Sequence, residues 1–415
     1  MLKNVLKKMS ASTLLLLGCQ GLLLGAMQIV SQRLGKAGYG QFGLAMSFSV
    51  FSAQFILWGM DPLLTFKYAR SSADDARSLL GIVLRQKQLA AFTAIFAGTL
   101  VALGWPDADE RFMIFLGSVD GACLACTMPS IFDARGKTAT WQFFAFIRHS
   151  IYLGLVLAVS RFFPEHFHPQ TVLELHLLCI LPELALEQFW VRRNVGIPHW
   201  PAPVREAFNL WRESAPMAVA VLAQQLLFNS GLPILHTFGD DAESGGLYLS
   251  SQFTTAAASF IAAPAAILHA RLALHAHEGP AFRRRVWQTA IPCFVAGIFV
   301  SLSYPVVTSA IVRSLFKNLA DSAPAILYID TWRLAPILAT IPFASALICL
   351  GRLRAFALCH VASALIGVSL SAALVPTYGP RAAACGIALG SCLCFVFSAT
   401  LVLLDKRSAA PEHTR

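Results

Sequence analysis

Apolar residues run through this chain in stretches of about 20, each separated from the next by a short polar or charged segment. An α-helix rises 1.5 Å per residue, so about 20 residues are needed to cross about 30 Å of hydrocarbon. The pattern therefore predicts an all-α polytopic membrane protein with about twelve transmembrane helices. The expected spans are 11–31, 40–59, 84–104, 112–131, 142–160, 172–191, 214–235, 246–268, 286–311, 328–350, 356–375 and 382–404.

Composition supports a membrane protein and leaves no room for a soluble domain. Of the 415 residues, 56% are hydrophobic and only 13% are charged, whereas soluble chains carry about 25% charged residues. Most Lys and Arg residues fall in alternate loops, which predicts that both termini face the cytoplasm. The net charge of +10 then reflects this bias and attraction to anionic membrane lipids. No basic run is combined with an aromatic platform, so we expect no nucleic-acid partner.

Two similar turns suggest that the chain consists of two halves. The sequence LGKAGYGQF at 34–42 and the sequence FGDDAESGGLY at 238–248 both place glycines around a short polar turn before an aromatic residue. Equal orientation of the two turns predicts two parallel six-helix lobes. We expect an N-terminal lobe at 1–191, a basic cytoplasmic linker at 192–213, a C-terminal lobe at 214–404 and a cytoplasmic tail at 405–415.

Charged residues at membrane depth are candidates for function because burying a charge in the bilayer costs at least about 2.5 kcal/mol. Arg148 lies about two turns inside the fifth expected span, and Asp120 lies near the middle of the fourth. One interpretation pairs these two residues in a salt bridge that joins the two helices. The other makes Arg148 a cavity cation that meets an anionic substrate.

Two further sets of polar residues have open alternatives. Arg333 enters the tenth span by about one turn, where it either binds substrate or snorkels to the interface with Asp330 as its partner. In the sixth span, His176, Glu183 and Glu187 share one helical stripe because their offsets of 7 and 11 residues return to nearly the same azimuth. That stripe is either a path for a coupling ion, with Asp120, or a structural feature near the membrane edge.

The seventh span carries amides that suit sugar hydroxyls or serve as interhelical contacts: Gln224, Gln225 and Asn229. No catalytic motif is present in the sequence, so we expect no enzyme activity and no cofactor. The ten cysteines all fall in expected spans. Cys123 and Cys126 form a CxxC without a second pair or a nearby histidine, which favours helix packing over a metal site.

The turn at 34–42, with Gly35, Gly38 and Gly40, resembles the start of the polysaccharide flippases. These are the O-antigen and exopolysaccharide translocases of the multidrug/oligosaccharidyl-lipid/polysaccharide exporter superfamily. The sequence WGMDP at 58–62 is similar to the Gly-x-Asp element that closes their second helix, here ending in Asp61. The twelve-helix, two-lobe plan extends the resemblance over the whole chain.

The resemblance implies two lobes around a cationic central cavity in a bacterial inner-membrane protein. By alternating access it would carry an undecaprenyl-diphosphate-linked oligosaccharide from the cytoplasmic to the periplasmic leaflet, in lipopolysaccharide or exopolysaccharide biosynthesis. Arg148 would bind the diphosphate, and a polysaccharide polymerase and chain-length proteins would be further partners. The chain departs from the family at Ser230-Gly231, where relatives often carry an acidic residue.

Two other classes of function remain open from the sequence. A cation-coupled drug antiporter of the same superfamily would use Asp120 and Glu183 as ion sites. A membrane-embedded polysaccharide polymerase or ligase would need a large outside loop rich in Arg or His, and the sequence contains no such loop.

Overall fold

The computed structural model describes residues 2–199, 202–238, 243–274 and 280–404. Within these ranges the chain is all-α, without a strand. The expected tail at 405–415 lies outside the described residues, as does 239–242 of the second glycine turn. The chain divides into two compact units, Met1–Ala218 and Val219–Arg415.

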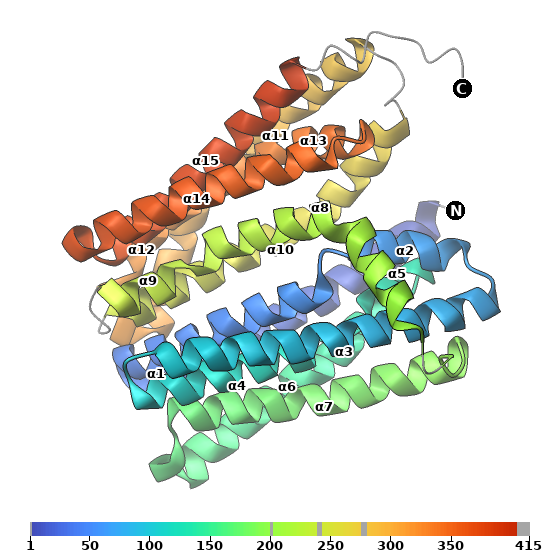
Figure 1. Ribbon diagram of the computed structural model, residues 1–415. Helices are drawn as coiled ribbons and strands as arrows, with labels where there is room; N and C mark the ends of the chain where they lie inside the picture. Colours follow the sequence, from blue (N-terminus) through green and yellow to red (C-terminus); the bar gives the residue numbers. More distant parts are fainter. Residues whose placement is uncertain (1, 200–201, 239–242, 275–279, 405–415) are drawn as a thin grey trace, which may run out of the picture. The chain divides into compact units, whose positions relative to one another are not determined.

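The first unit is a helical bundle whose longest member, α1, packs along both α4 and α6 (Figure 1). Short helices cap one end, where α2 contacts α5. Its helices are α1 (Leu2–Leu57), α2 (Asp61–Arg70), α3 (Ala73–Gly104), α4 (Ala108–Ala125), α5 (Pro129–Ala134), α6 (Thr138–Phe162) and α7 (Pro169–Asn194).

The second unit is a bundle in which α14 and α15 lie side by side and α13 packs against α11 and α15. Its helices are α9 (Gly231–Phe238), α10 (Ser244–Leu274), α11 (Pro280–Leu315), α12 (Ala323–Asp330), α13 (Leu334–Cys349), α14 (Leu353–Tyr378) and α15 (Pro380–Leu404). Helix α8 (Val204–Asn229) runs through the junction at Ala218, so the expected linker 192–213 contains the start of a helix.

Each expected span overlaps a helix, but 112–131 and 214–235 are interrupted, and the helices at 172–191 and 246–268 are not among the candidate membrane spans of the described residues. By length and apolar composition, eight helices of the described residues can cross a membrane, or nine if α8 and α9, which are bent by 45° at Ser230, count as one span. The eight are Ala11–Leu57, Ala73–Gly104, Ala108–Ala134, Thr138–Phe162, Ala281–Leu315, Ala323–Cys349, Leu353–Tyr378 and Pro380–Leu404. The first of these ranges covers two expected spans. The number of long apolar helices shows that the protein is a polytopic helical membrane protein.

The loop expected between the first two spans, at 32–39, is shorter than predicted, because only Gly35 within it leaves the helical conformation. Helical backbone continues on both sides of a single break at Gly35, whose φ of 70° and ψ of −172° lie in a region that only glycine adopts readily. The glycine turn thus separates two helices that the single label α1 covers, and the predicted turn lies at Gly35. Close to this turn, a side chain at Gly38 would meet the Leu34 Cβ at 3.1 Å, and Gly40 is buried.

Two glycines on α4 allow it to lie directly against the second half of α1. A Cβ at Gly117 would stand 2.2 Å from the Ala45 carbonyl oxygen, and a Cβ at Gly121 would stand 2.1 Å from that of Ser49. Small residues four apart let the backbones of membrane helices approach closely. Because Asp120 precedes Gly121, this contact also brings its carboxylate to Ser49.

Candidate functional site

A fully buried carboxylate on α4 forms the first part of the polar cluster in the N-terminal unit. Asp120 accepts a hydrogen bond from Ser49 Oγ at 2.6 Å, and its other oxygen lies 2.8 Å from His176 Nδ1. The edge of the Tyr152 ring packs against the His176 imidazole, with the centroids 5.2 Å apart. Helices α1, α4, α6 and α7 thus each contribute a side chain around this carboxylate.

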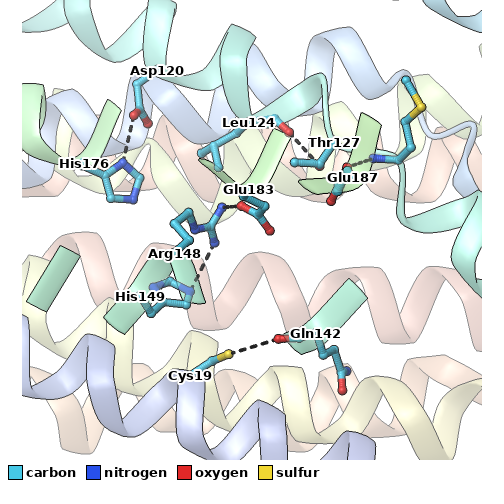
Figure 2. A network of polar contacts seen from close by, with 11 residues as sticks. Cys19, Asp120, Leu124, Thr127, Gln142, Arg148, His149, His176, Glu183 and Glu187 are labelled. Atoms are coloured by element: carbon cyan, nitrogen blue, oxygen red, sulfur yellow. Dashed lines mark hydrogen bonds and ion pairs between the residues drawn. The ribbon is translucent and has the colours of Figure 1, made fainter. Parts of the chain in front are cut away.

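The second part is an ion pair between α6 and α7. Arg148 Nη1 lies 2.7 Å from Glu183 Oε2, and Arg148 Nη2 is 3.2 Å from His149 Nε2. The salt bridge proposed between Arg148 and Asp120 is therefore wrong: α7 supplies a separate partner to each of them (Figure 2). The depths of Arg148 and Asp120 along their own helices were consistent with a direct pair. Those depths do not show where α7 packs.

The two members of the ion pair differ in exposure. The Arg148 side chain is 14% exposed and that of Glu183 is 1% exposed. Arg148 Nε is buried without a hydrogen-bond partner in the described part of the chain. Arg148 is therefore the more exposed member of the pair, although its Nε is enclosed by protein.

The third part of the cluster was only partly evident from the sequence. Glu187 is fully buried and accepts a hydrogen bond from the Met128 backbone N–H at 2.9 Å. Lys87 is also buried and donates to the Thr127 carbonyl oxygen at 2.6 Å. Lys87 lies inside the expected span 84–104, so the rule that selected Arg148 should also have selected it.

The predicted stripe on α7 orders these groups along the bundle. His176, Glu183 and Glu187 are all buried, and their spacing extends over about 16 Å at 1.5 Å per residue. Figure 2 shows Asp120 at His176, Arg148 at Glu183, and the Glu187 contact further along. The structure therefore brings together Asp120, His176, Glu183 and Arg148, and their roles in substrate binding and ion coupling stay predictions.

Asp61, predicted as a loop-motif residue, is the first residue of α2. It follows a turn in which Trp58 and Gly59 both have positive φ, at 51° and 60°. Burial raises the pKa of the Asp61 carboxyl, and attraction to Lys87 opposes that shift. Asp61 thus interacts electrostatically with Lys87, and its role stays a prediction.

In the C-terminal unit, Arg333 is buried, with its side chain 3% exposed, so the snorkelling interpretation is wrong. Its Nη2 lies 3.3 Å from Asp330 Oδ2, and its guanidinium stands 5.1 Å from the centre of the Phe228 ring. Arg333 ends a short 3-10 turn, Thr331–Arg333, and immediately precedes the first residue of α13. Buried packing, rather than contact with the interface, holds this cation.

The three predicted amides of α8 have different surroundings. Asn229 Nδ2 donates to Gln225 Oε1 at 2.9 Å, so these two amides bond to each other. Gln224 instead lines a cavity within the C-terminal unit, together with Phe228 and His360. The structure therefore does not gather Gln224, Gln225 and Asn229 at one place.

The helical architecture defines a polytopic membrane protein, and the ionic cluster lies within its N-terminal unit. The comparison structure "Lipid II flippase MurJ, inward closed conformation" has a TM-score of 0.70 at 11% identity, covering 94% of this chain and 87% of that one. An inward-facing multidrug resistance MATE family transporter of the MOP superfamily has a TM-score of 0.68 at 13% identity, covering 95% and 96%.

A third solved structure, a mutant of the Vibrio cholerae MATE transporter VcmN, has a TM-score of 0.61 at 13% identity and covers 98% of this chain and 97% of its own. No known family profile and no curated protein matches the chain by sequence. At these identities the likeness establishes the fold, which is shared by flippases and by drug transporters.

Proposed function

We propose that this protein is a flippase that moves an undecaprenyl-diphosphate-linked oligosaccharide to the outer leaflet of the bacterial inner membrane by alternating access. The observation that carries the proposal is Arg148, the more exposed member of an ion pair between two helices, one of which is long and apolar enough to span a membrane. A guanidinium presents a planar fork of donors that matches phosphate oxygens. The turn at 34–42 and the MurJ-like fold support the same class of substrate.

The pairing with Glu183 gives the site a way to bind and then release an anion. In the structure the charge of Arg148 is balanced by Glu183. A diphosphate that approaches Arg148 competes with this carboxylate, and the competition weakens when Glu183 is neutral. Asp120 and His176 form a second pair that can hold a coupling proton. We therefore propose Arg148 as the phosphate ligand, and Asp120, His176 and Glu183 as the ion-coupling groups.

A cation-coupled drug antiporter is the second candidate. The observation that favours it is the presence of buried carboxylates, Asp120 and Glu183, inside a fold that MATE transporters share. In that case Arg148 would hold Glu183 in place and would not touch the substrate. The two candidates differ because a drug antiporter exports organic cations, which an accessible guanidinium repels.

The proposal places both termini in the cytoplasm and makes membrane lipids the surroundings of the protein. A polysaccharide polymerase and chain-length proteins would then receive the substrate on the periplasmic side. Arg333 and the α8 amides remain proposed contacts to the saccharide, of which Gln224 is developed below.

A deletion strain tests the proposal. We expect completed lipid-linked repeat units to accumulate on the cytoplasmic face and surface polysaccharide to be lost. Wild type should restore the polysaccharide, whereas Arg148→Gln should not. Arg161→Gln is the matched control, because Arg161 ends the same helix and is exposed. Repeat units that reach the periplasmic face without polymerising would contradict the proposal, and lost resistance to organic cations with normal polysaccharide would favour the antiporter.

A further inference from the structure

The C-terminal unit contains a cavity of about 180 Å³ among α8, α13, α14 and α15. At about 30 Å³ per water, this is space for about six waters, or for one sugar-sized ring. The hydrogen-bonding side chains on its wall are Gln224, Thr340, His360, Ser363 and Ser391. No ionisable acid, lysine or arginine is among the described residues that line it.

The hydroxyl groups on this wall are available mainly as acceptors. Thr340 Oγ1 donates to the Pro336 carbonyl at 2.7 Å, and Ser391 Oγ donates to that of Ile387 at 2.9 Å. Ser363 Oγ likewise donates to the Cys359 carbonyl. A hydroxyl has one proton, so a donating hydroxyl keeps its lone pairs for another partner.

His360 adds another acceptor. Its Nδ1 lies 3.1 Å from the Phe356 carbonyl oxygen, which can only accept, so Nδ1 carries the proton. In the neutral ring Nε2 is then a free acceptor on the opposite side of the imidazole. Gln224 offers donors as well as an acceptor on this wall, and the Cys394 thiol adds only a weak donor. The cavity therefore suits a ligand that brings several hydrogen-bond donors.

The walls of the cavity also include aromatic rings, and a buried arginine lies behind one of them. Phe228 and Phe356 give the cavity aromatic walls, and the Arg333 guanidinium stands 5.1 Å from the centre of the Phe228 ring. Its Nη1 is buried without a hydrogen-bond partner in the described part of the chain. The charge of this guanidinium is balanced by Asp330, and a neutral ring with hydroxyl groups on its edge and apolar faces satisfies both the acceptors and the aromatic walls.

We infer that this cavity binds a neutral saccharide ring, with Thr340, His360 and Ser391 accepting from its hydroxyls and Gln224 completing the contacts. Its identification as part of the lipid-linked substrate rests on the proposed function. The inference that the cavity binds a neutral saccharide rests on its hydrogen-bonding groups alone. Sequence analysis selected Gln224 but missed His360, which lies in the expected span 356–375.

The test is ligand-observed saturation-transfer NMR on the full-length protein in nanodiscs free of sugar detergents. The probes are galactose and N-acetylglucosamine, with tetraphenylphosphonium as a cationic comparison. His360→Phe keeps a planar ring and removes Nε2, and Thr340→Val keeps the shape and removes an acceptor. Thr308→Val is the matched control, because Thr308 is buried on α11, donates to its own i−4 carbonyl and lies outside the cavity.

We expect a saccharide signal from wild type and a loss of affinity of about fivefold for each removed hydrogen bond, with Thr308→Val unchanged. Absence of a saccharide signal, equal losses in Thr308→Val, or tetraphenylphosphonium binding that depends on His360 would overturn the inference. Cytoplasmic accumulation of repeat units in the deletion strain separates the two proposals. If accumulation occurs without saccharide binding, only the cavity assignment fails. If the sugar binds but nothing accumulates, only the proposed function fails.

Discussion

Arg148 on α6 and Glu183 on α7 form an ion pair of 2.7 Å in which the arginine is 14% exposed and the glutamate 1%. A partly buried charge that loses its partner is strongly destabilising, whereas loss of both charges often is not. The two members also differ chemically, since a carboxyl can take up a proton and a guanidinium cannot lose one. The pair is therefore asymmetric in both access and chemistry.

This asymmetry predicts unequal effects on stability. Glu183→Gln leaves a permanent positive charge without its partner and should cost about 3 kcal/mol of unfolding free energy. Arg148→Gln should cost less, because Glu183 can become neutral. The double variant should be more stable than Glu183→Gln alone. Denaturant unfolding of the purified protein measures all three, and equal costs for the two single variants would show that the pair is not held as described.

Both carboxylate oxygens of Asp120 are expected to contribute to the stability of the fold. Asp120→Asn replaces one acceptor by a donor that faces either Ser49 Oγ or His176 Nδ1, and should cost about 1–3 kcal/mol. Ser49→Ala removes only one of the two contacts and should cost less. The comparison is made by thermal unfolding. An Asp120→Asn protein as stable as wild type would mean that the carboxylate is not held by these two contacts.

Gly121 should not tolerate a side chain. A Cβ there would stand 2.1 Å from the Ser49 carbonyl oxygen, so Gly121→Ala should separate α4 from α1 and cost about 1–3 kcal/mol. Gly154→Ala on α6 is the matched control: its Cβ meets nothing within 4 Å, and alanine is the better helix former. Similar unfolding temperatures for the two variants would contradict the close contact.

Gly35 is expected to be required for its backbone alone. No atom lies within 4 Å of a Cβ at this position, so Gly35→Ala should cost about 1–3 kcal/mol through φ strain. Gly21→Ala lies on the same helix, also in open space and without a positive φ, and should be neutral or slightly stabilising. Thermal unfolding of both variants isolates the backbone effect. Equal unfolding temperatures for Gly35→Ala and Gly21→Ala would show that residue 35 does not need a positive φ.

The raised pKa of Asp61 predicts that the stability of the fold depends on pH. Burial raises the pKa of its carboxyl above that of the unfolded chain. The folded protein then holds the proton more tightly, so this contribution to stability is full below the unfolded pKa and is lost as pH rises through the folded pKa. Asp61→Asn should remove this slope in acid-to-neutral unfolding scans. Asp109→Asn, at an exposed position on α4, is the control, and an unchanged slope in Asp61→Asn would refute the assignment.

The helices were predictable because hydropathy and length are local properties. Each of the twelve expected spans overlaps a helix, and the first two are separate helices joined by a short turn at Gly35. The length of this turn depends on the backbone conformation of one glycine, and the neighbouring residues do not reveal that conformation.

Positions of site residues along a single helix were predictable from the sequence. Contacts between side chains on different helices were not. The 3.6-residue period placed His176, Glu183 and Glu187 on one stripe, and the structure buries all three. The partner of Arg148 depended on how α7 packs against α4 and α6, which spacing along one helix cannot supply. The contact of Lys87 with a backbone carbonyl also had no signal in the sequence.

The most direct test of the proposed flippase uses purified protein in liposomes that contain a fluorescent undecaprenyl-diphosphate-linked saccharide. Loss of fluorescence to an impermeant quencher reports movement between leaflets. We predict that wild type and Arg161→Gln make the inner-leaflet lipid accessible and that Arg148→Gln slows this at least tenfold. Equal rates in Arg148→Gln and wild type would contradict the role of Arg148, and wild-type liposomes no faster than protein-free liposomes would contradict the flippase itself.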